Sequence, residues 1–219
     1  MKNAYISLST VSNEKRKYEL RVRAERQADT RRRIAAATSE LHGEVGPART
    51  TIAEIARRAG VERLTVYNNY PDEYDLFAAC QHHFLAENPV PDPSSALAIA
   101  DPGKRLESVL HELYGWYRRT ERMSTNVRRD RELVPALDAL MAETVDARMA
   151  GLAEILAAGF AGEGKPARAV RAAVGLSLDF WAWRRLAREG LSPAAAARLM
   201  GDAVRAAAEA PRRVQAAAR

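Results

Sequence analysis

The chain has 219 residues, of which 47% are hydrophobic and 28% are charged, and it carries a formal net charge of +6. No apolar run approaches the roughly 20 residues that a membrane span needs, and the N-terminus lacks the apolar stretch and cleavage site of a secretory signal. The single cysteine, Cys80, excludes an internal disulfide and agrees with a reducing cytoplasm, which we take as the expected location.

Alanine is abundant, and no segment alternates polar and apolar residues for long. This pattern predicts an all-α protein with a core large enough for one or two domains.

The positive charge is concentrated at one end of the chain. Residues 1–70 hold 14 Lys and Arg against 8 Asp and Glu, whereas residues 71–219 hold 20 of each kind. A basic end on a neutral body is typical of a protein that binds phosphates, although a solvated charged face is the simpler alternative.

Residues 1–30 form a basic extension. Residues 1–12 show no hydrophobic period and are expected to be mobile, while residues 14–33 are rich in good helix formers without a strong apolar stripe. Two interpretations stay open for this segment: an arm that follows the DNA backbone or enters a minor groove, or a solvated extension of the first helix. The first helix proper is predicted from about Thr30 to Glu44, with a break at Gly46-Pro47.

Residues 51–70 carry the most informative pattern. Thr51 and Glu54 have the spacing of a capping box, and apolar residues then recur at helical spacing up to Gly60, which suits a left-handed helix end. A short polar helix follows, over about residues 62–67. Two helices joined by a sharp glycine turn predict a helix-turn-helix, whose second helix fits the major groove of DNA.

From Arg32 through Phe77 the sequence resembles the N-terminal DNA-binding domain of the TetR family of transcriptional regulators. The residues that carry this resemblance are Arg33-Ile34, Gly46, Ile55-Ala56, Ala59-Gly60-Val61, Thr65-Val66-Tyr67, Tyr70-Pro71 and Leu76. The stretch around Trp183 and the following Gly190-Leu-Ser-Pro are similar to the ligand-binding half of that family, although less diagnostic.

The resemblance implies an all-α fold with two parts. These are an N-terminal three-helix helix-turn-helix DNA-binding domain at residues 31–87 and a C-terminal helical ligand-binding and dimerisation domain at residues 101–210. It also implies a homodimeric repressor that a small-molecule effector releases from a roughly palindromic operator in double-stranded DNA.

The chain departs from the family pattern at four positions. Leu64 stands where a small residue is usual, Glu62 replaces Ser, Asn69 replaces an aromatic residue or His, and Glu73 replaces a phosphate-contacting Lys. The base sequence that relatives read therefore does not transfer to this chain.

Candidate DNA-contacting residues follow from their chemistry. Arg bonds guanine and Asn bonds adenine in the major groove, and Leu can meet a thymine methyl. We expect base contacts from Arg63, Thr65 and Asn68, with Leu64 and Asn69 as lesser candidates. Phosphate contacts are expected from Thr51, Tyr67 and Tyr70, although either tyrosine ring could instead belong to the core.

Downstream, Asp72 is predicted to cap a connecting helix in which Cys80 is a small core residue. A proline-rich linker over residues 88–103 leads to a helix that ends near Asn126. A further stretch runs from Pro135 to Phe160, and residues 159–166 form a loop. One helix, apolar on two faces, is predicted from Val170 through Trp183 to Gly190, before a final helix capped by Ser192.

Two further expectations concern the body. The two-sided helix and the small-residue face of the last helix favour a four-helix dimer interface over a plain monomer core. A ligand pocket is expected among large apolar side chains that would otherwise be ordinary core, namely Trp116, Met123, Met141, Phe160, Phe180 and Trp183.

Catalytic motifs are missing from the sequence. It has no Gly-rich phosphate loop, no Gly-x-Ser-x-Gly, no Cys-x-x-Cys and no Glu-x-x-His, and its four histidines have no partner at metal-ligand spacing. We therefore expect no catalytic site, no metal and no cofactor. The alternatives are an effector-independent architectural DNA-binding protein, which a fully packed body would favour, and, less favoured, an all-α enzyme.

Overall fold

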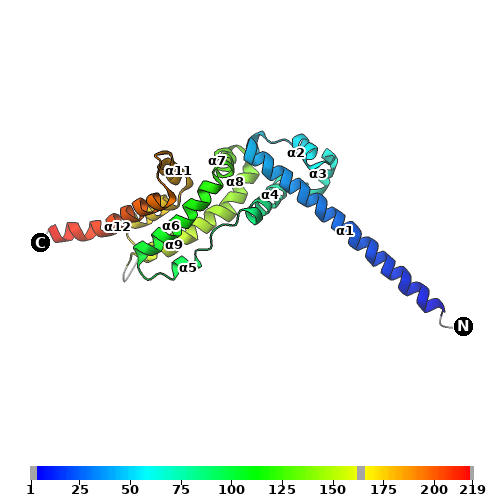
Figure 1. The fold of residues 1–219 in the computed structure, drawn as a ribbon, viewed down its shortest axis with the longest axis horizontal. Helices are drawn as coiled ribbons and strands as arrows, with labels where there is room; N and C mark the ends of the chain where they lie inside the picture. The colour runs from blue at the N-terminus through cyan, green and yellow to red at the C-terminus, as the bar shows by residue number, and fades with distance from the viewer. Residues whose placement is uncertain (1–3, 162–165, 218–219) are drawn as a thin grey trace.

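The computed structural model describes residues 4–161 and 166–217, which form helices and no strand. The all-α prediction is therefore confirmed. The molecule is elongated, with the helix-turn-helix region between a long projecting N-terminal helix and the helical body, and the last helix projects at the opposite extreme (Figure 1).

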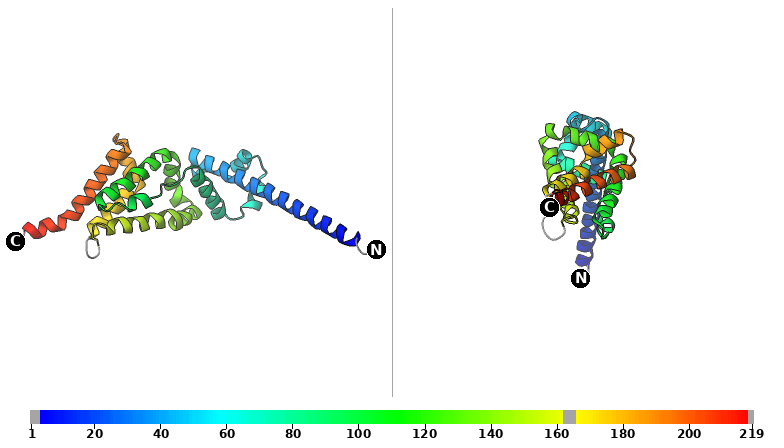
Figure 2. Two further views of the ribbon diagram at one scale, coloured as in Figure 1. Left: turned by 60° about the horizontal axis from the view of Figure 1, so that its bottom comes forward. Right: turned by 90° about the vertical axis from the view of Figure 1, so that its left-hand side faces the viewer.

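The N-terminal unit starts with one long helix. Its elements are α1 (Ala4–Glu44), the 3₁₀ turn η1 (Pro47–Arg49), α2 (Ile52–Ala59), α3 (Arg63–Asn69) and α4 (Glu73–Glu87). The basic extension is continuous with α1 and projects away from the rest of the molecule (Figures 1 and 2). The expected mobile segment is thus helical over residues 4–12, and residues 1–3 lie outside the described part.

A small core holds this unit together. Ile34 and Val66 are fully buried and Ile55 is 2% exposed. They pack with further buried side chains from α1, α2, α4 and the residue after α3, namely Ala37, Leu41, Ala56, Ala59, Leu76 and Tyr70. Burial of one large aliphatic side chain contributes about 1.5–3 kcal/mol. This core fixes α3 against α1 and leaves the opposite side of α3 in solvent.

The body consists of the remaining elements. They are α5 (Ser94–Leu97), α6 (Pro102–Arg119), α7 (Glu121–Asp130), η2 (Arg131–Leu133), α8 (Pro135–Met141), the π-helical segment η3 (Ala142–Asp146), α9 (Ala147–Ala158), α10 (Arg168–Leu178), α11 (Phe180–Arg188) and α12 (Pro193–Ala217). Its core centres on α6, against which α9, α10, α11 and α12 pack.

Two helix predictions for the body are wrong. The helix expected to run to Asn126 ends at Arg119, because the Thr120 hydroxyl bonds the carbonyl of Trp116 at 2.9 Å and the backbone turns there. The single helix expected over residues 170–190 is two helices. Asp179 adopts an extended backbone and accepts a hydrogen bond from the Ala182 N–H at 2.7 Å, which starts α11 in a new direction.

Other predicted boundaries hold. Asp72 caps α4, Asp101 caps α6 with Pro102 at its first position, and Ser192 caps α12. The linker contains the single turn α5, and the expected loop after α9 is described at residues 159–161 and 166.

The connecting helix α4 belongs to both halves. One side of α4 packs into the N-terminal core through Leu76, while Phe77 forms a separate buried cluster with Leu137, Leu140 and Met141 of α8. A movement of α8 would therefore act directly on the helix that supports α3.

Candidate nucleic-acid interface and ligand cavity

The turn between α2 and α3 has the geometry that the sequence predicts. The Thr51 hydroxyl accepts the Glu54 N–H at 3.2 Å, and Gly60 lies in the left-handed region at φ 66°. The Val61 N–H closes the turn on the Ala56 carbonyl at 3.0 Å. A side chain other than glycine would strain this backbone at residue 60.

One face of α3 is turned to solvent. Leu64 is 65% exposed and Tyr67 is 53% exposed, and Arg63 and Asn68 are also exposed, whereas Val66 between them is fully buried. We name Arg63, Leu64, Tyr67 and Asn68 the α3 outer face. In the described part of the chain no acidic group lies within 4.0 Å of the Arg63 guanidinium, so its donors are available to a partner.

Two candidates on α3 are less available. Thr65 is half-buried, and its carbonyl accepts the side-chain amide of Asn69 at 2.8 Å. The Asn69 side-chain oxygen is buried without a hydrogen bond. Thr65 and Asn69 thus stabilise the end of α3 and lie behind the α3 outer face.

Tyr70 occupies the core, and the expected phosphate contact is not supported. Its side chain is 5% exposed and its hydroxyl donates to the Arg31 carbonyl at 3.1 Å, while the Arg31 guanidinium lies 4.2 Å from its ring centre. Burial raises the pKa of Tyr70. The alternative considered from the sequence, a ring in the core, is the arrangement that the structure has.

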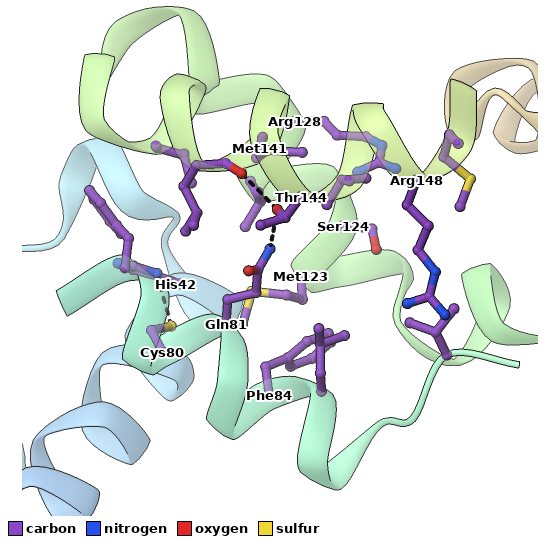
Figure 3. A pocket seen from close by; sticks show the side chains of 18 of the residues that line it. His42, Cys80, Gln81, Phe84, Met123, Ser124, Arg128, Met141, Thr144 and Arg148 are labelled. Atoms are coloured by element: carbon purple, nitrogen blue, oxygen red, sulfur yellow. Dashed lines mark hydrogen bonds between the residues drawn. The ribbon is translucent and has the colours of Figure 1, made fainter. Parts of the chain in front are cut away.

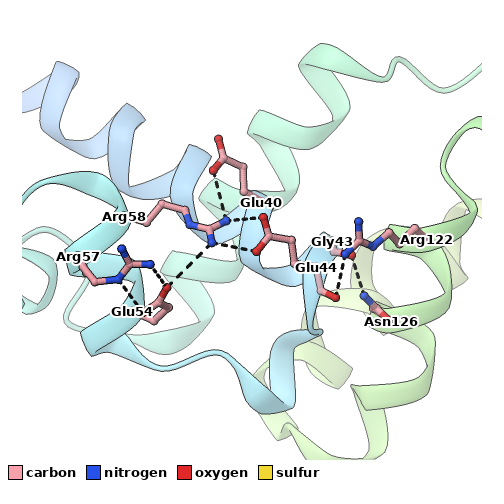
Figure 4. A network of polar contacts seen from close by, with 8 residues as sticks. All are labelled: Glu40, Gly43, Glu44, Glu54, Arg57, Arg58, Arg122 and Asn126. Atoms are coloured by element: carbon pink, nitrogen blue, oxygen red, sulfur yellow. Dashed lines mark hydrogen bonds and ion pairs between the residues drawn. The ribbon is translucent and has the colours of Figure 1, made fainter.

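Ion pairs attach α2 to α1 (Figure 4). Arg58 binds both carboxylate oxygens of Glu44, at 2.7 and 2.9 Å, and also lies near Glu40 and Glu54. Arg57 pairs with Glu54. Arg58 therefore positions the first helix of the motif against α1, whereas the Arg57 pair lies within α2. The exposed Thr51 leaves the N-terminal end of α2 open to solvent.

Hydrogen bonds join the C-terminal end of α1 to α7. Asn126 is 7% exposed, and its amide donates to the carbonyls of His42 and Gly43 at 2.9 and 3.0 Å. Nearby, Arg122 donates to the Glu44 carbonyl at 3.2 Å (Figure 4). These bonds satisfy carbonyls that the end of a helix leaves unpaired. We name the contacts of Arg122, Asn126 and Arg129 with α1 and the following turn the α1–α7 clamp.

Asp130 completes this junction. It is 2% exposed, accepts the Ala48 N–H at 3.1 Å, and pairs with Arg129, which also donates to the Val45 carbonyl at 3.2 Å. Burial acts to raise the Asp130 pKa, but the bonds from Arg129 and Ala48 outweigh it and lower the pKa. Asp130 therefore stays ionised and holds the turn before α2.

A cavity of about 170 Å³ lies between the N-terminal unit and the body (Figure 3). It is lined by residues of α1, α4, α6, α7, α8, η3 and α9, and its wall is largely apolar. For scale, an engineered apolar cavity of about 150 Å³ binds benzene. We name this space the central cavity.

The structure brings three of the six expected ligand-site residues to the central cavity. Trp116, Met123 and Met141 line it. Phe180 and Trp183 are instead 1% and 2% exposed within the body core, with ring centres 5.5 Å apart, and Phe160 packs at the edge of the same core. The break at Asp179 turns Phe180 and Trp183 away from α8 and toward α6.

Several cavity residues were not identified from the sequence. His42, Phe84, Arg128 and Arg148 line the central cavity. Only Phe84 had a usable signal, since it lies on the apolar side of α4. The others are polar residues whose position depends on how the helices pack.

His42 and Cys80 are adjacent on the cavity wall, with Nδ1 and Sγ 3.5 Å apart. Burial lowers the pKa of His42 to about 4, against the opposing effect of Asp130, so His42 is neutral at pH 7. Burial also raises the pKa of Cys80 to about 12. Cys80 is therefore a protonated thiol at neutral pH, which fits the expected small core residue better than a reactive group.

Within residues 4–161 and 166–217, no three His, Cys, Asp or Glu side chains gather closely enough to hold a metal ion. No helix in the same ranges is long and apolar enough to cross a membrane.

Known proteins share both the motif and the fold. Residues 34–80 match the family described as bacterial regulatory proteins, tetR family. Uncharacterized HTH-type transcriptional regulators from two strains of Mycobacterium tuberculosis are 36% identical over 113 residues, covering 46% of this chain. The chain spans 60% of the length of these relatives. A similar regulator of Mycobacterium bovis is 47% identical over 53 residues, which is 24% of this chain and 28% of the relative.

Among solved structures, a TetR-like transcriptional regulator from Rhodococcus sp. RHA1 has the same fold. It aligns with a TM-score of 0.54 at 19% identity, over 81% of this chain and 94% of that one. The protein is thus an all-α helix-turn-helix protein with a helical body. Its residues 34–80 carry the match to the tetR family of bacterial regulatory proteins.

Proposed function

We propose that this protein is a dimeric cytoplasmic repressor that binds a palindromic operator and is released from it by a small molecule in the central cavity. The observation that carries the proposal is the α3 outer face. Its four side chains are free for a partner, while Val66 and Tyr70 anchor the helix from behind. A rigid helix with one exposed polar face suits the major groove.

Each side chain of the α3 outer face has a matching partner on DNA. Arg63 would bond O6 and N7 of guanine, Asn68 would bond N6 and N7 of adenine, and Leu64 would meet a thymine methyl. The Tyr67 hydroxyl and the open N-terminal end of α2 at Thr51 would contact phosphates. Thr65, Asn69 and Tyr70 would support this face from within.

The location of the central cavity supports control by an effector. His42 and Phe84 belong to the N-terminal unit, whereas Met123 and Met141 belong to the body, so a ligand would touch both halves. The ligand releases DNA if it binds more tightly to an arrangement in which the distance between the two α3 helices of the dimer does not match the spacing of the operator half-sites. The α1–α7 clamp and the contact of Phe77 with α8 would transmit that change.

Exposed apolar side chains on the body support dimerisation. Leu176, Trp181 and Leu199 are 57%, 43% and 48% exposed and belong to the neighbouring helices α10, α11 and α12. Large exposed apolar groups on adjacent elements are typical of an interface. A homodimer formed there would present two copies of α3 to two operator half-sites.

The alternatives are less well supported. An effector-independent architectural protein would be favoured by a fully packed body, whereas this body contains a cavity of about 170 Å³. For an enzyme, we find no group of titratable side chains in the described residues that fits a catalytic role. We therefore propose that the protein is not an enzyme.

The direct test is binding of the purified protein to duplex DNA taken from beside its own gene, compared with a random duplex over a salt series. The proposal expects a site bound at least about 1,000-fold more tightly than the random duplex, with two matched half-sites. Equal, weak binding of both duplexes that is lost steeply with salt would contradict it, because a basic surface alone behaves in that way.

A further inference from the structure

The central cavity carries positive charge without any negative charge. Its lining includes Arg128 and Arg148, and no aspartate or glutamate lines it. The remaining titratable groups, His42, Cys80 and Tyr117, are neutral at pH 7, because burial lowers the pKa of His42 and raises the pKa of Cys80 and of Tyr117. A cation at the wall of a largely apolar cavity favours an anionic ligand, since low polarity strengthens the attraction.

Arg128 differs from the arginines that surround it. Arg129 pairs with Asp130, and Arg131 pairs with Asp138 and Asp146. Within the described chain, no carboxylate lies within 4.0 Å of Arg128. Its guanidinium lies 5.0 Å from the ring centre of Phe180 and 5.9 Å from that of Tyr117. These rings hold the charged group in position without neutralising it.

Arg148 lies between two spaces. A second hollow of about 590 Å³, between residues 90–97, α6 and α9, shares Arg148 and Met149 with the central cavity. Asp92 lines this hollow, and its pKa is lowered by the hydrogen bonds from Ser94 and, to a smaller extent, by the charge of Arg148. No acidic group of the described residues comes within 4.0 Å of Arg148. Arg148 is exposed and can therefore meet a ligand that enters from the hollow.

The two arginines lie on the same side of the cavity. Arg128, Arg148 and Ser124 lie on one side in Figure 3, and His42 and Cys80 lie on the other, with Met123, Met141 and Phe84 between them. Gln81 and Thr144 also lie in this middle region, where the Gln81 amide donates to the Thr144 hydroxyl at 3.0 Å. This arrangement matches a molecule with one acidic end and one apolar end.

We infer that the effector is a small organic acid whose carboxylate binds Arg128 and Arg148 and whose apolar part fills the space between Phe84, Met123 and Met141. Arginine binds a carboxylate through paired, charge-assisted hydrogen bonds. The cavity volume of about 170 Å³ limits the apolar part to one ring or a short chain. The inference rests on the proposed function, because it assigns a chemical class to the effector of that same site.

The test uses the purified 219-residue chain and matched pairs of compounds. Benzoate, 3-phenylpropionate, hexanoate and octanoate are each compared with their primary amides, which have nearly the same shape without the charge. Binding is measured by calorimetry at pH 7, and release of the operator is measured separately by fluorescence anisotropy.

We expect at least one acid to bind about tenfold to hundredfold more tightly than its amide, as charged hydrogen bonds generally contribute. Arg128→Gln and Arg148→Gln should each remove most of this preference. Arg188→Gln is the matched control, because it loses the same charge from an exposed site on α11 outside the cavity. Arg148 is exposed, so its variant should fold even if the Arg128 variant does not.

Each outcome decides between the two proposals. Equal binding of acids and amides, an acid preference that survives both substitutions, or no binding of any compound at millimolar concentration would overturn the acid inference and leave the operator proposal intact. An acid that binds through both arginines without changing operator affinity would confirm the site and contradict the proposed mechanism of release.

Discussion

Arg63 lies at the first position of α3 with an exposed guanidinium and, among the described residues, no acidic group within 4.0 Å. We predict that Arg63→Ala weakens binding to the specific operator by about 1–3 kcal/mol and relaxes the preference at one base position. Anisotropy titrations with operator variants and a random duplex measure both effects. Arg188→Ala on α11 is the control for lost charge, and an equal loss on every duplex would show that Arg63 contacts phosphates instead of a base.

The two tyrosines at the end of α3 should behave in opposite ways. Tyr70→Phe removes a hydroxyl that donates to the Arg31 carbonyl, so we predict a loss of about 0.5–1.5 kcal/mol in the free energy of unfolding with unchanged DNA affinity. Tyr67→Phe removes an exposed hydroxyl, so it should weaken DNA binding and leave stability unchanged. Urea denaturation and anisotropy on both variants distinguish them. Weaker DNA binding by a fully stable Tyr70→Phe variant would show that the Tyr70 hydroxyl contacts DNA.

His42 makes stability depend on pH. Its pKa is about 4 in the folded protein, against 6.5 for an unperturbed histidine, because burial disfavours the charged form. Between these values the unfolded chain binds a proton that the folded chain does not. The stabilisation is therefore complete above pH 6.5 and is lost as the pH falls to about 4.

We predict that His42→Leu removes this dependence. Over the interval from pH 6.5 to 4, the wild-type protein should lose about 3 kcal/mol more than the variant, at about 1.4 kcal/mol for each pH unit. Denaturation curves at pH 7, 5.5 and 4 give the comparison, in which acid effects common to both proteins cancel. Parallel curves for the two proteins would contradict a neutral, buried His42.

At the scale of elements, two adjacent residues of α7 offer a test of the junction with α1. Asn126 donates to two carbonyls at the end of α1, whereas the Thr125 hydroxyl is buried without a hydrogen bond. Asn126→Ala should lower the free energy of unfolding by about 1–3 kcal/mol, because it leaves buried carbonyls unpaired. Thr125→Val keeps the side-chain shape and removes an unpaired polar atom, so it should be neutral or stabilising.

Thermal and urea unfolding of both variants measure this difference. If Asn126→Ala were as stable as the wild type, the α1–α7 clamp would have no mechanical role. If Thr125→Val were clearly destabilised, its hydroxyl would have a partner such as a bound water.

Local signals explain which elements could be predicted. The ends of α2, α4, α6 and α12 depend on capping residues within three positions of the helix, and Gly60 adopts the positive φ that its place in the pattern requires. The break at Asp179 was missed because an apolar run continues on both sides of it. Asp179 was itself the available signal, as a capping residue three positions before Ala182.

The sequence predicts the residues of the α3 outer face better than those of the central cavity. The second helix of the motif predicts contacts from Arg63, Leu64, Tyr67 and Asn68, which the structure leaves exposed, but it also predicts a base contact from the half-buried Thr65. The burial of Tyr70 depends on its contact with α1. Cavity residues depend on the packing of helices distant in sequence. For that reason Arg128 and Arg148 were missed, and Phe180 and Trp183 were assigned to a pocket although they fill the core of the body.

At the scale of the whole molecule, the elongated shape separates two surfaces. The α3 outer face lies toward one end, and the exposed apolar side chains of α10, α11 and α12 belong to the body at the other (Figures 1 and 2). A dimer formed through the body would hold two copies of α3 at a distance set by the orientation of each N-terminal unit. Under the proposed function, a ligand in the central cavity would alter that distance.

The dimer can be tested at one exposed position. Leu199 on α12 is 48% exposed in the single chain, so Leu199→Glu should leave the fold of each subunit intact. In a dimer formed through this face, the substitution would bury an unpaired charge at a cost of about 3–5 kcal/mol and weaken association by at least about a hundredfold.

Ile155→Glu on α9, where the wild-type side chain is 52% exposed, is the matched control outside the proposed interface. Sedimentation equilibrium should show a monomer for the first variant alone, with weaker operator binding because two half-sites are no longer bound together. A Leu199→Glu protein that remains dimeric would place the interface elsewhere on the molecule.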